Sequence, residues 1–495
     1  LDAGKQVLFL LPEIALTTQI ITRLQVYFGN QISVFHSKYS MNERVEVWRN
    51  VLENKSKAGI LLGARSALFL PFSNLGLIVV DEEHETSYKQ FEPSPRYNAR
   101  DAAIVLAKLH AAKILLGSAT PSLESYFNTA QNKYGLVALN RRNGDVQLPK
   151  IKLMDVKEKQ RKKEMKGHFS DRMLLLIQEA LDAKEQVILF QNRRGYSPVV
   201  ECKTCGVSPE CPNCDVTLTF HKFKQELRCH YCNYQRAMPN SCGACGSNTL
   251  NTKGFGTEQI EMELKVLFPD FKIGRMDLDT TRGKHGYQKI ITAFESKEID
   301  ILVGTQMLSK GLDFENVSLV GILNADTMLN FPDFRAHERA YQMMVQVSGR
   351  AGRSKKQGNV AIQTYNPNHQ ILQQVSTTRY AEMYKEQLQE RWQYKYPPYY
   401  RLIKITLKHR DYSKVDKGID WLAKALQQSF GEFVLGPTAP AVSRIRNQYI
   451  KNLVIKIPPK QSLVNTKNQI TKIRNTFEAV SDFRPIRFII DVDAY

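Results

Sequence analysis

Short apolar runs alternate with helical stretches over the first 140 residues of the chain. The runs rich in Ile, Leu and Val, which we expect to be strands, are Val7–Leu11, Gly59–Leu62, Leu77–Val80 and Lys113–Leu116. They are apolar on both faces, as in a parallel sheet that is covered by helices. Helical segments such as Thr17–Phe28 and Ala99–His110 lie between them. The pattern therefore predicts repeated βα units and an α/β fold over residues 1–145.

A second α/β set follows a basic, weakly hydrophobic segment. Residues 146–169 include the run KEKQRKKEMK, and we expect them to form a solvated linker or a flexible helix. Ser170 is expected to cap a helix over Asp171–Ala183. The strands expected after it are Gln186–Phe190, Lys272–Met276, Ile299–Gly304, Leu319–Asn324 and Asn359–Gln363. We place this second domain at 170–200 and 250–375, with a separate module inserted over 201–249.

The last hundred residues predict a different order of elements. That order is strand, helix, strand, strand, helix, strand, at Leu402–Lys408, Tyr412–Phe430, Val434–Ile445, Asn452–Ile457, Gln461–Phe477 and Ile486–Val492. It is the order of the split βαβ, ferredoxin-like arrangement. We therefore expect a C-terminal α+β domain over residues 376–495.

Charge indicates the kind of partner. The 495 residues include 69 Lys and Arg against 49 Asp and Glu, a formal net charge of +20. An excess of this size favours a polyanionic partner, usually nucleic acid, over a merely soluble basic surface. The chain has no run of 18 apolar residues, so we expect no membrane partner.

All eight cysteines lie in four CxxC pairs between Cys202 and Cys245. Such clustering indicates metal ligands rather than disulfides, and hence a reducing, cytoplasmic setting. Four pairs make two closed, structural zinc sites of four cysteines each, and three pairings are possible. We favour a nested arrangement, because the 14-residue gap between the second and third pairs suits a zinc ribbon and the five-residue gap between the first two is tight. The inner set is then Cys211, Cys214, Cys229 and Cys232, and the outer set is Cys202, Cys205, Cys242 and Cys245.

An apolar strand ends in three acids and a histidine at Asp81-Glu-Glu-His84. Ligands of open α/β sheets bind where strands end. Phosphoryl transfer needs a carboxylate for Mg²⁺ and another to position water, which are roles that fit Asp81 and Glu82. His84 could couple such a site to other parts of the chain. The alternative is a solvated acidic turn.

Three further motifs favour the nucleotide hypothesis. Gly117–Ser122 (GSATPS) follows the next strand, and Val303–Asp313 (VGTQMLSKGLD) places hydroxyls, an amide, a lysine and an acid after another. Gln346–Arg353 (QVSGRAGR) holds two arginines three residues apart, which share one face if helical. Arginine is the residue that binds a γ-phosphate and stabilises its charge.

Taken together, these motifs resemble those of the PriA-type replication-restart helicases of superfamily 2. The segments that carry the resemblance are Leu11–Thr17, Gly63–Phe69, Asp81–His84, Tyr88–Gln90, Arg96–Asp101, Gly117–Ser122, Asn192–Tyr196, Gly304–Gln306 and Gln346–Arg353. The resemblance implies two RecA-like lobes that close on ATP and Mg²⁺, and the same nested zinc sites. It also implies that Asp81 and Glu82 form the Walker B pair and that Arg350 and Arg353 contact the γ-phosphate. The other residues expected at the nucleotide are Gly311, Asp313 and Gln346.

The resemblance further implies DNA contacts. Thr17, Arg65, Thr305 and Gln306 are similar to positions that track the strand or couple the lobes. Tyr88, Lys89, Arg96 and Tyr97 belong to a loop similar to the one that senses DNA, where rings would stack on bases and cations would bind phosphates. In the C-terminal domain, Arg444, Arg446 and Tyr449 are expected to hold phosphate and a base. The alternatives are an ordinary surface loop and a solvated basic face.

The sequence is thus interpreted as an ATP-dependent 3′→5′ DNA helicase of replication restart in the bacterial cytoplasm, near the nucleoid. Its expected partners are forked and single-stranded DNA, single-stranded-DNA-binding protein, other primosome components and the machinery that loads the replicative helicase. A phosphate loop, GxxxxGK[ST], is not found, so we expect a fragment that begins downstream of it and hydrolyses ATP poorly alone. The alternatives are a non-catalytic zinc-ribbon DNA-binding or scaffolding protein, and an RNA helicase or a motor subunit of another complex.

Overall fold

The structure is a computed structural model. It describes residues 1–12, 17–36, 39–139, 147–192, 199–221, 225–253, 256–277, 279–281, 286–308, 314–352 and 357–494. The chain divides into two compact units, Leu1–Asn192 with Glu261–Lys385, and Arg193–Ile260 with Glu386–Tyr495. Each unit is described by itself.

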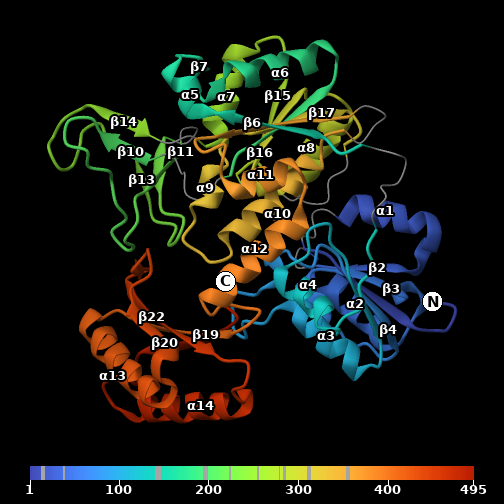
Figure 1. Ribbon diagram of the computed structural model, residues 1–495, viewed down its shortest axis with the longest axis vertical. Helices are drawn as coiled ribbons and strands as arrows, with labels where there is room; N and C mark the ends of the chain where they lie inside the picture. The colour runs from blue at the N-terminus through green and yellow to red at the C-terminus, as the bar shows by residue number, and fades with distance from the viewer. Residues whose placement is uncertain are drawn as a thin grey trace. The chain divides into compact units, whose positions relative to one another are not determined.

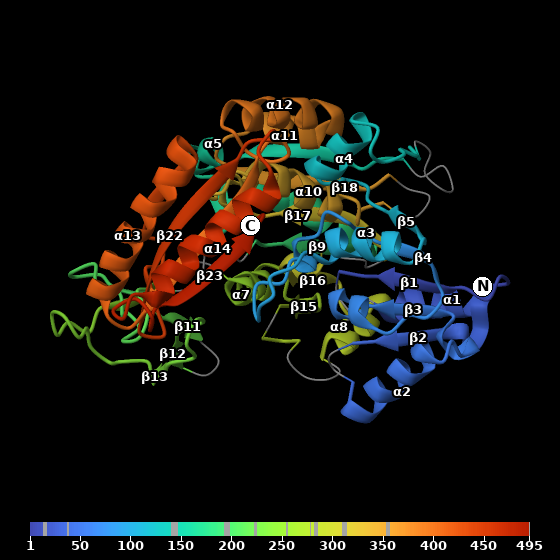
Figure 2. The same ribbon diagram turned by 90° about the horizontal axis from the view of Figure 1, so that it is seen from below.

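The first unit begins with a five-stranded parallel sheet. Its strands lie in the order β2 (Ile32–Phe35), β3 (Ile60–Gly63), β1 (Gln6–Leu10), β4 (Leu75–Val80) and β5 (Lys113–Leu116). Figure 2 shows them side by side in this order. Four of these strands match the expected apolar runs. The edge strand β2 was not foreseen, because its four half-exposed residues make only a short apolar run.

Helices alternate with these strands, as the pattern predicts. They are α1 (Thr17–Phe28), α2 (Met41–Leu52), α3 (Ala99–Leu109) and α4 (Leu123–Ala130). All four residues of β3 are buried, as the two-faced burial of a parallel sheet requires. Ser122 caps α4 by accepting the backbone N–H of Ser125 at 3.3 Å. This cap holds the GSATPS segment directly after β5.

The second sheet of this unit has six parallel strands. Their order is β15 (Ile273–Met276), β16 (Ile301–Gly304), β9 (Gln186–Phe190), β17 (Val317–Ile322), β18 (Asn359–Thr364) and β6 (Lys150–Asp155). The helices connected to it are α6 (Asp171–Asp182), α7 (Thr257–Leu267), α8 (Gly286–Glu295), α9 (Asp326–Leu329), α10 (Ala336–Ser348), α11 (Gln370–Ser376) and α12 (Tyr380–Gln393). Ser170 caps α6 as expected, through the backbone N–H of Met173.

The strand β6 corrects the expected linker. The described part of 146–169 contains β6, the helix α5 (Val156–Arg161) and a short hairpin of β7 (Met165–Lys166) and β8 (Phe169–Ser170). In β6 the apolar Ile151 and Leu153 pack on the core of the second sheet and alternate with exposed lysines. The lysines make the segment strongly charged, and this charge favoured the prediction of a solvated segment over the period-two pattern of a strand.

The second unit contains a small antiparallel sheet around the cysteines. Its order is β13 (Gln235–Ala237), β12 (Glu226–Arg228), β11 (Thr219–His221), β10 (Val199–Cys202) and β14 (Leu250–Lys253). No helix among the described residues is long and apolar enough to cross a bilayer.

The C-terminal part of the second unit has the ferredoxin-like arrangement that the sequence predicts. Its antiparallel sheet runs β20 (Val434–Thr438), β22 (Gln448–Ile457), β19 (Arg401–His409) and β23 (Arg487–Val492). Figure 1 shows the helices α13 (Tyr412–Phe430) and α14 (Leu463–Ala479) beside this sheet. They contribute Leu422 and Phe477 to the core that they share with the strands. A two-residue strand, β21 (Arg444–Ile445), pairs with the start of β22.

Candidate nucleotide and zinc sites

Asp81 and Glu82 lie where β4 ends. The backbone N–H of Asp81 donates to the carbonyl of Leu10 at 3.0 Å, and the Asp81 carbonyl accepts the hydroxyl of Tyr88 at 2.7 Å. Glu82 has a positive φ of 48° and donates its N–H to Oδ1 of Asp81 at 3.1 Å. A non-glycine residue in this region is strained, and such strain concentrates at functional sites. The turn therefore holds two adjacent carboxylates in a fixed relation.

The electrostatics of this pair suit a bound cation. Burial, and then the neighbouring charge of Glu82, raise the pKa of Asp81 to about 6. Oε2 of Glu82 is buried and makes no hydrogen bond to any residue that the structure describes. Carboxylate oxygens are the ligands that Mg²⁺ prefers. These residues fit the expected metal site of a nucleotide complex.

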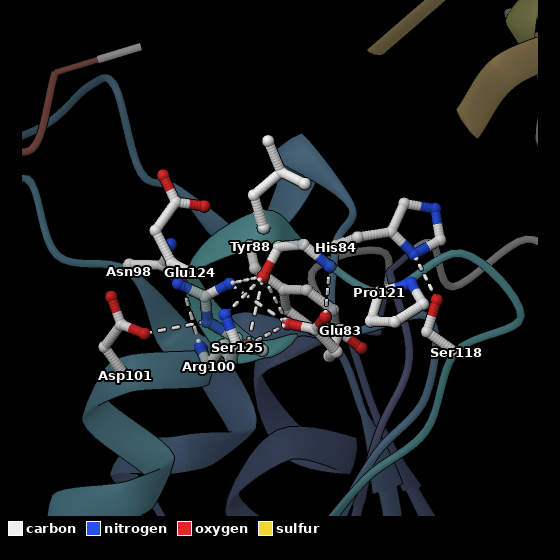
Figure 3. A network of polar contacts seen from close by, with 12 residues as sticks. Glu83, His84, Tyr88, Asn98, Arg100, Asp101, Ser118, Pro121, Glu124 and Ser125 are labelled. Carbon is white, nitrogen blue, oxygen red and sulfur yellow. Dashed lines mark hydrogen bonds and ion pairs between the residues drawn. The ribbon is translucent and has the colours of Figure 1, made fainter. Parts of the chain in front are cut away.

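Glu83 serves a different purpose from its neighbours, because its carboxylate is the centre of a buried network. Arg100 and the hydroxyls of Ser122 and Ser125 donate to Oε2 at 3.0, 3.0 and 2.7 Å, and the N–H of Ser122 donates to Oε1 at 2.6 Å. Figure 3 shows Arg100 and Ser125 directed at Glu83. Glu83 therefore ties the strand end to α3 and α4, a role that the sequence analysis did not assign.

His84 connects the carboxylates to the second sheet's helices. Its Nδ1 lies 2.7 Å from the hydroxyl of Ser118 and 3.7 Å from Oε2 of Glu82. Its Nε2 lies 3.0 Å from the side-chain nitrogen of Gln346 on α10. Because an amide nitrogen can only donate, Nε2 accepts and the proton of a neutral ring sits on Nδ1. The coupling expected of His84 thus has a specific partner.

A second set of contacts joins the GSATPS segment to α10 and α12. The N–H of Leu123 donates to Glu338 at 2.9 Å, and Gln342 donates to the carbonyl of Thr120 at 3.2 Å. The Leu123 side chain is fully buried in the core cluster of the second sheet. The hydroxyl of Tyr380 donates to the carbonyl of Pro121 at 2.8 Å. The segment after β5 is therefore hydrogen-bonded to both α10 and α12.

The arginines expected at the γ-phosphate are described only in part. Arg350 follows α10, about one turn beyond Gln346, and is buried. Arg353, Gly311 and Asp313 lie outside the described residues. Of the residues predicted to bind nucleotide, the structure brings Glu82 and Gln346 together through His84. The contact of either arginine with a phosphate stays a prediction.

The cysteine sulfurs form the two nested sets that the sequence favours. Within each set the four sulfur atoms lie within 4.8 Å of one another. Sulfur pairs in the outer set are 3.6 Å apart, and Cys211 and Cys232 in the inner set are 3.5 Å apart. Four sulfurs at about 2.3 Å from a tetrahedral zinc ion are separated by roughly 3.8 Å. Both sets therefore fit a zinc ion.

Family models match most parts of the chain. They are the DEAD/DEAH box helicase (residues 1–128), the PriA DNA helicase Cys-rich region (211–236), the helicase conserved C-terminal domain (250–355) and the primosomal protein N C-terminal domain (392–495).

Curated relatives match over nearly the whole chain, and each is named replication restart protein PriA. The protein of Bacillus subtilis is 40% identical over 100% of this chain and 61% of its own length. That of Haemophilus influenzae is 39% identical over 100% and 66%. That of Rickettsia felis is 39% identical over 93% and 70%. The chain belongs to the PriA family of replication restart proteins. It spans about 60% of the length of the Bacillus relative.

The loop that this PriA-family chain was expected to use for DNA is more buried than predicted. Tyr88 and Lys89 are 1% and 2% exposed. Tyr88 also donates to Leu10, at 2.9 Å, and Lys89 donates its ammonium to the carbonyl of Arg96 at 3.1 Å. A buried ring and a buried ammonium cannot stack on a base or hold a phosphate. The prediction that these two side chains contact DNA is therefore wrong for this conformation.

The other residues of the first unit that were predicted to contact DNA differ in how buried they are and in whether they already bind protein. Arg65 donates to the carbonyls of Ser87 and Lys89 at 3.1 and 3.2 Å, so its guanidinium already supports the loop. Thr305 is 9% exposed, and Gln306 begins a 3-10 turn. Arg96 and Tyr97, in the same loop as Tyr88, are half-buried. The side chain of Thr17 lies outside the described residues. Their contacts with DNA stay predictions.

Arg444 and Arg446 are engaged with the zinc module. Nε of Arg444 donates to Asp215 at 2.8 Å, and Nε of Arg446 donates to the carbonyl of Tyr231 at 3.1 Å. Both Nε groups therefore bind protein, and the contact of Arg444 and Arg446 with phosphate stays a prediction. Tyr449 packs edge-on against Tyr412, with ring centroids 5.4 Å apart.

Proposed function

We propose that the protein is an ATP-dependent 3′→5′ DNA helicase that acts in replication restart. The observation that carries the proposal is the chain of contacts from Glu82 through His84 to Gln346, at 3.7 and 3.0 Å. A hydrolytic carboxylate in contact with a helix of the second sheet is the arrangement that a motor needs to convert nucleotide turnover into movement. Membership of the PriA family supports the same function.

In this proposal each nucleotide residue has one task. Asp81 holds Mg²⁺, Glu82 orients the attacking water, and Arg350 and Arg353 neutralise charge on the transferred phosphate. Gly311 and Asp313, which lie outside the described residues, are proposed as further nucleotide contacts. The bound Mg²⁺ supplies charge stabilisation, and it keeps Asp81 ionised by opposing the raised pKa of that carboxyl.

His84 transmits the state of this site. Nδ1 of His84 lies 2.7 Å from the hydroxyl of Ser118 and 3.7 Å from Oε2 of Glu82, so a movement of Glu82 toward the ring competes with the Ser118 contact. A turn of the ring moves Nε2 and so strengthens or weakens the contact with Gln346. Opening and closing of the two sheets around the nucleotide then steps the DNA strand.

The partners are proposed from charge and from the family. A net charge of +20 suits forked and single-stranded DNA, and the restart function implies single-stranded-DNA-binding protein, other primosome components and the loading machinery of the replicative helicase. Each set of four cysteines holds one zinc ion, which stabilises the module and performs no chemistry. The site of action is the nucleoid in the cytoplasm.

The test is DNA-stimulated ATP hydrolysis and unwinding of forked DNA. Because the chain spans about 60% of the Bacillus relative, the assay uses a protein of the relatives' length that carries this chain. We expect Glu82→Gln to reduce turnover at least 100-fold with little loss of DNA affinity. Asp270→Asn, a change at an exposed position, is the control. DNA binding without any ATP turnover in the parent protein would favour the scaffolding alternative.

A further inference from the structure

A hairpin of the ferredoxin-like domain touches one of the two zinc sites. The backbone N–H of Arg446 lies 3.2 Å from Sγ of Cys214 and donates to it. Within the inner site, the N–H of Asn213 similarly donates to Sγ of Cys211 at 3.4 Å. One donor to the inner sulfurs therefore comes from more than 200 residues away in the sequence.

The backbone of the hairpin directs this N–H at the sulfur. Ile445 pairs with Gln448, so Arg446 and Asn447 form a two-residue turn, and both have positive φ, at 52° and 57°. Turns of this kind usually contain Asn-Gly, because side chains resist the left-handed region. An arginine there is unfavourable for the hairpin alone. Its contacts with the zinc module offset the strain.

The neighbours of Arg446 in the hairpin also contact the zinc module. Arg444 bridges Asp215 and the carbonyl of Pro212, at 2.8 and 3.1 Å. The N–H of Asn447 donates to the carbonyl of Asn213 at 2.8 Å. Ile445 packs against the apolar cluster that contains Cys211, Cys214 and Cys229. The hairpin thus binds the segment between the first two inner ligands.

The outer site has no such support. The hydrogen bonds of its four sulfurs, among the residues described, come only from the zinc module, such as the N–H of Ala244 to Cys242 at 3.4 Å. The two sites have the same ligand chemistry, but the inner cysteines are also more buried than the outer ones. Each site of a variant is therefore compared with the same site of the parent protein.

We infer that the hairpin of residues 444–449 is an outer-shell part of the inner zinc site, so that retention of this zinc ion and docking of the ferredoxin-like domain depend on each other. An N–H that donates to a thiolate delocalises its charge and fixes its direction toward the metal. Loss of such outer-shell partners typically weakens metal binding about 10- to 100-fold. The inference is independent of the proposed helicase activity.

The test compares two substitutions at Arg446. Arg446→Pro removes the N–H and cannot adopt positive φ, whereas Arg446→Gly keeps the N–H and adopts it freely. Zinc release to a chromogenic chelator is followed in each protein, and alkylation of the cysteines with mass mapping identifies which set loses its metal. We expect Arg446→Pro to release one zinc ion at least tenfold faster, with exposure of the inner cysteines alone. Arg446→Gly keeps the N–H and loses only the side-chain contact with Tyr231, so it should release the ion at least severalfold more slowly than Arg446→Pro.

Arg444→Ala provides a second, milder variant in case the proline disrupts the domain. It should accelerate release of the same ion roughly two- to fivefold and leave the outer site unchanged. Equal acceleration at both sites, or none at either, overturns the inference. A parent protein that contains fewer than two zinc ions would instead contradict the zinc assignment, which is a separate result.

Discussion

The side-chain nitrogen of Gln346 donates to Nε2 of His84 across a distance of 3.0 Å, from a helix of the second sheet to the strand end of the first. The contact requires an acceptor nitrogen on His84 and hence a neutral ring with its proton on Nδ1. That proton points to Ser118 and lies near Glu82. The His84 side chain thereby contacts residues from the ends of the first sheet's strands and from a helix of the second sheet.

Replacing Gln346 should separate hydrolysis from movement. In Gln346→Leu the helix keeps its packing but loses the hydrogen bond, which is worth about 1 kcal/mol. We expect unwinding per ATP hydrolysed to fall roughly fivefold or more, with nucleotide affinity nearly unchanged. Gln178→Leu, at an exposed position on α6, is the control. A parallel loss of nucleotide affinity would place Gln346 at the nucleotide instead.

The stability of the first sheet should depend on pH through Asp81. Its pKa is about 6 in the folded chain and lower when unfolded, so its protonated form favours the fold and this contribution is lost as the pH rises through 6. Asp81→Asn should therefore raise the free energy of unfolding at pH 8, without Mg²⁺, by on the order of 1–3 kcal/mol. Below about pH 4 the two proteins should be equally stable. Urea titrations at several pH values measure this, and an advantage independent of pH would refute it.

Glu83 should matter for folding more than for chemistry. Glu83→Ala removes the ion pair between Glu83 and the buried guanidinium of Arg100. The hydrogen bond from Nε of Arg100 to Oδ1 of Asp101, at 2.7 Å, is kept. Breaking a buried ion pair in this way is expected to lower the free energy of unfolding by about 3–5 kcal/mol. Glu83→Gln should lose less, because it still accepts from the two serines. Denaturant midpoints are compared with those of Glu46→Ala, an exposed change on α2 that should have almost no effect.

The metal content should follow the nested sets. Elemental analysis of the purified protein is expected to give two zinc ions per chain, and Cys211→Ser should remove one of them. Cys242→Ser should remove the other and leave the inner set protected from alkylation. Loss of both ions from either variant would indicate that the sites are not independent.

The strands and the zinc-ligand sets could be predicted because their sequence patterns repeat. The partners of individual side chains could not, because each depends on a contact between distant segments. Parallel strands such as Gln186–Phe190 are continuous apolar runs, and the cysteine spacing allows few pairings, so both were predictable. Tyr88 and Arg444 were expected to contact DNA from the family resemblance of their segments and from their residue types. Their actual partners, the carbonyl of Asp81 and the carboxylate of Asp215, lie in segments that only the folded chain brings near. The tight turn at Arg446 and Asn447 lacks the glycine that usually marks such a turn in a sequence, so it was not predicted.

Six residue pairs join β6 to β18 in parallel register, and they determine which fragments of the chain would keep an intact second sheet. A polypeptide that starts at residue 170 would contain β18 but not its neighbour, and would present a bare, largely apolar strand edge to other copies. Self-association of such a piece would follow from the missing edge and would say nothing of oligomers in the cell. Conversely, a protease that nicks the chain between residues 156 and 169 should leave the two fragments bound to each other, since the strand upstream of the cut remains hydrogen-bonded to the sheet downstream of it.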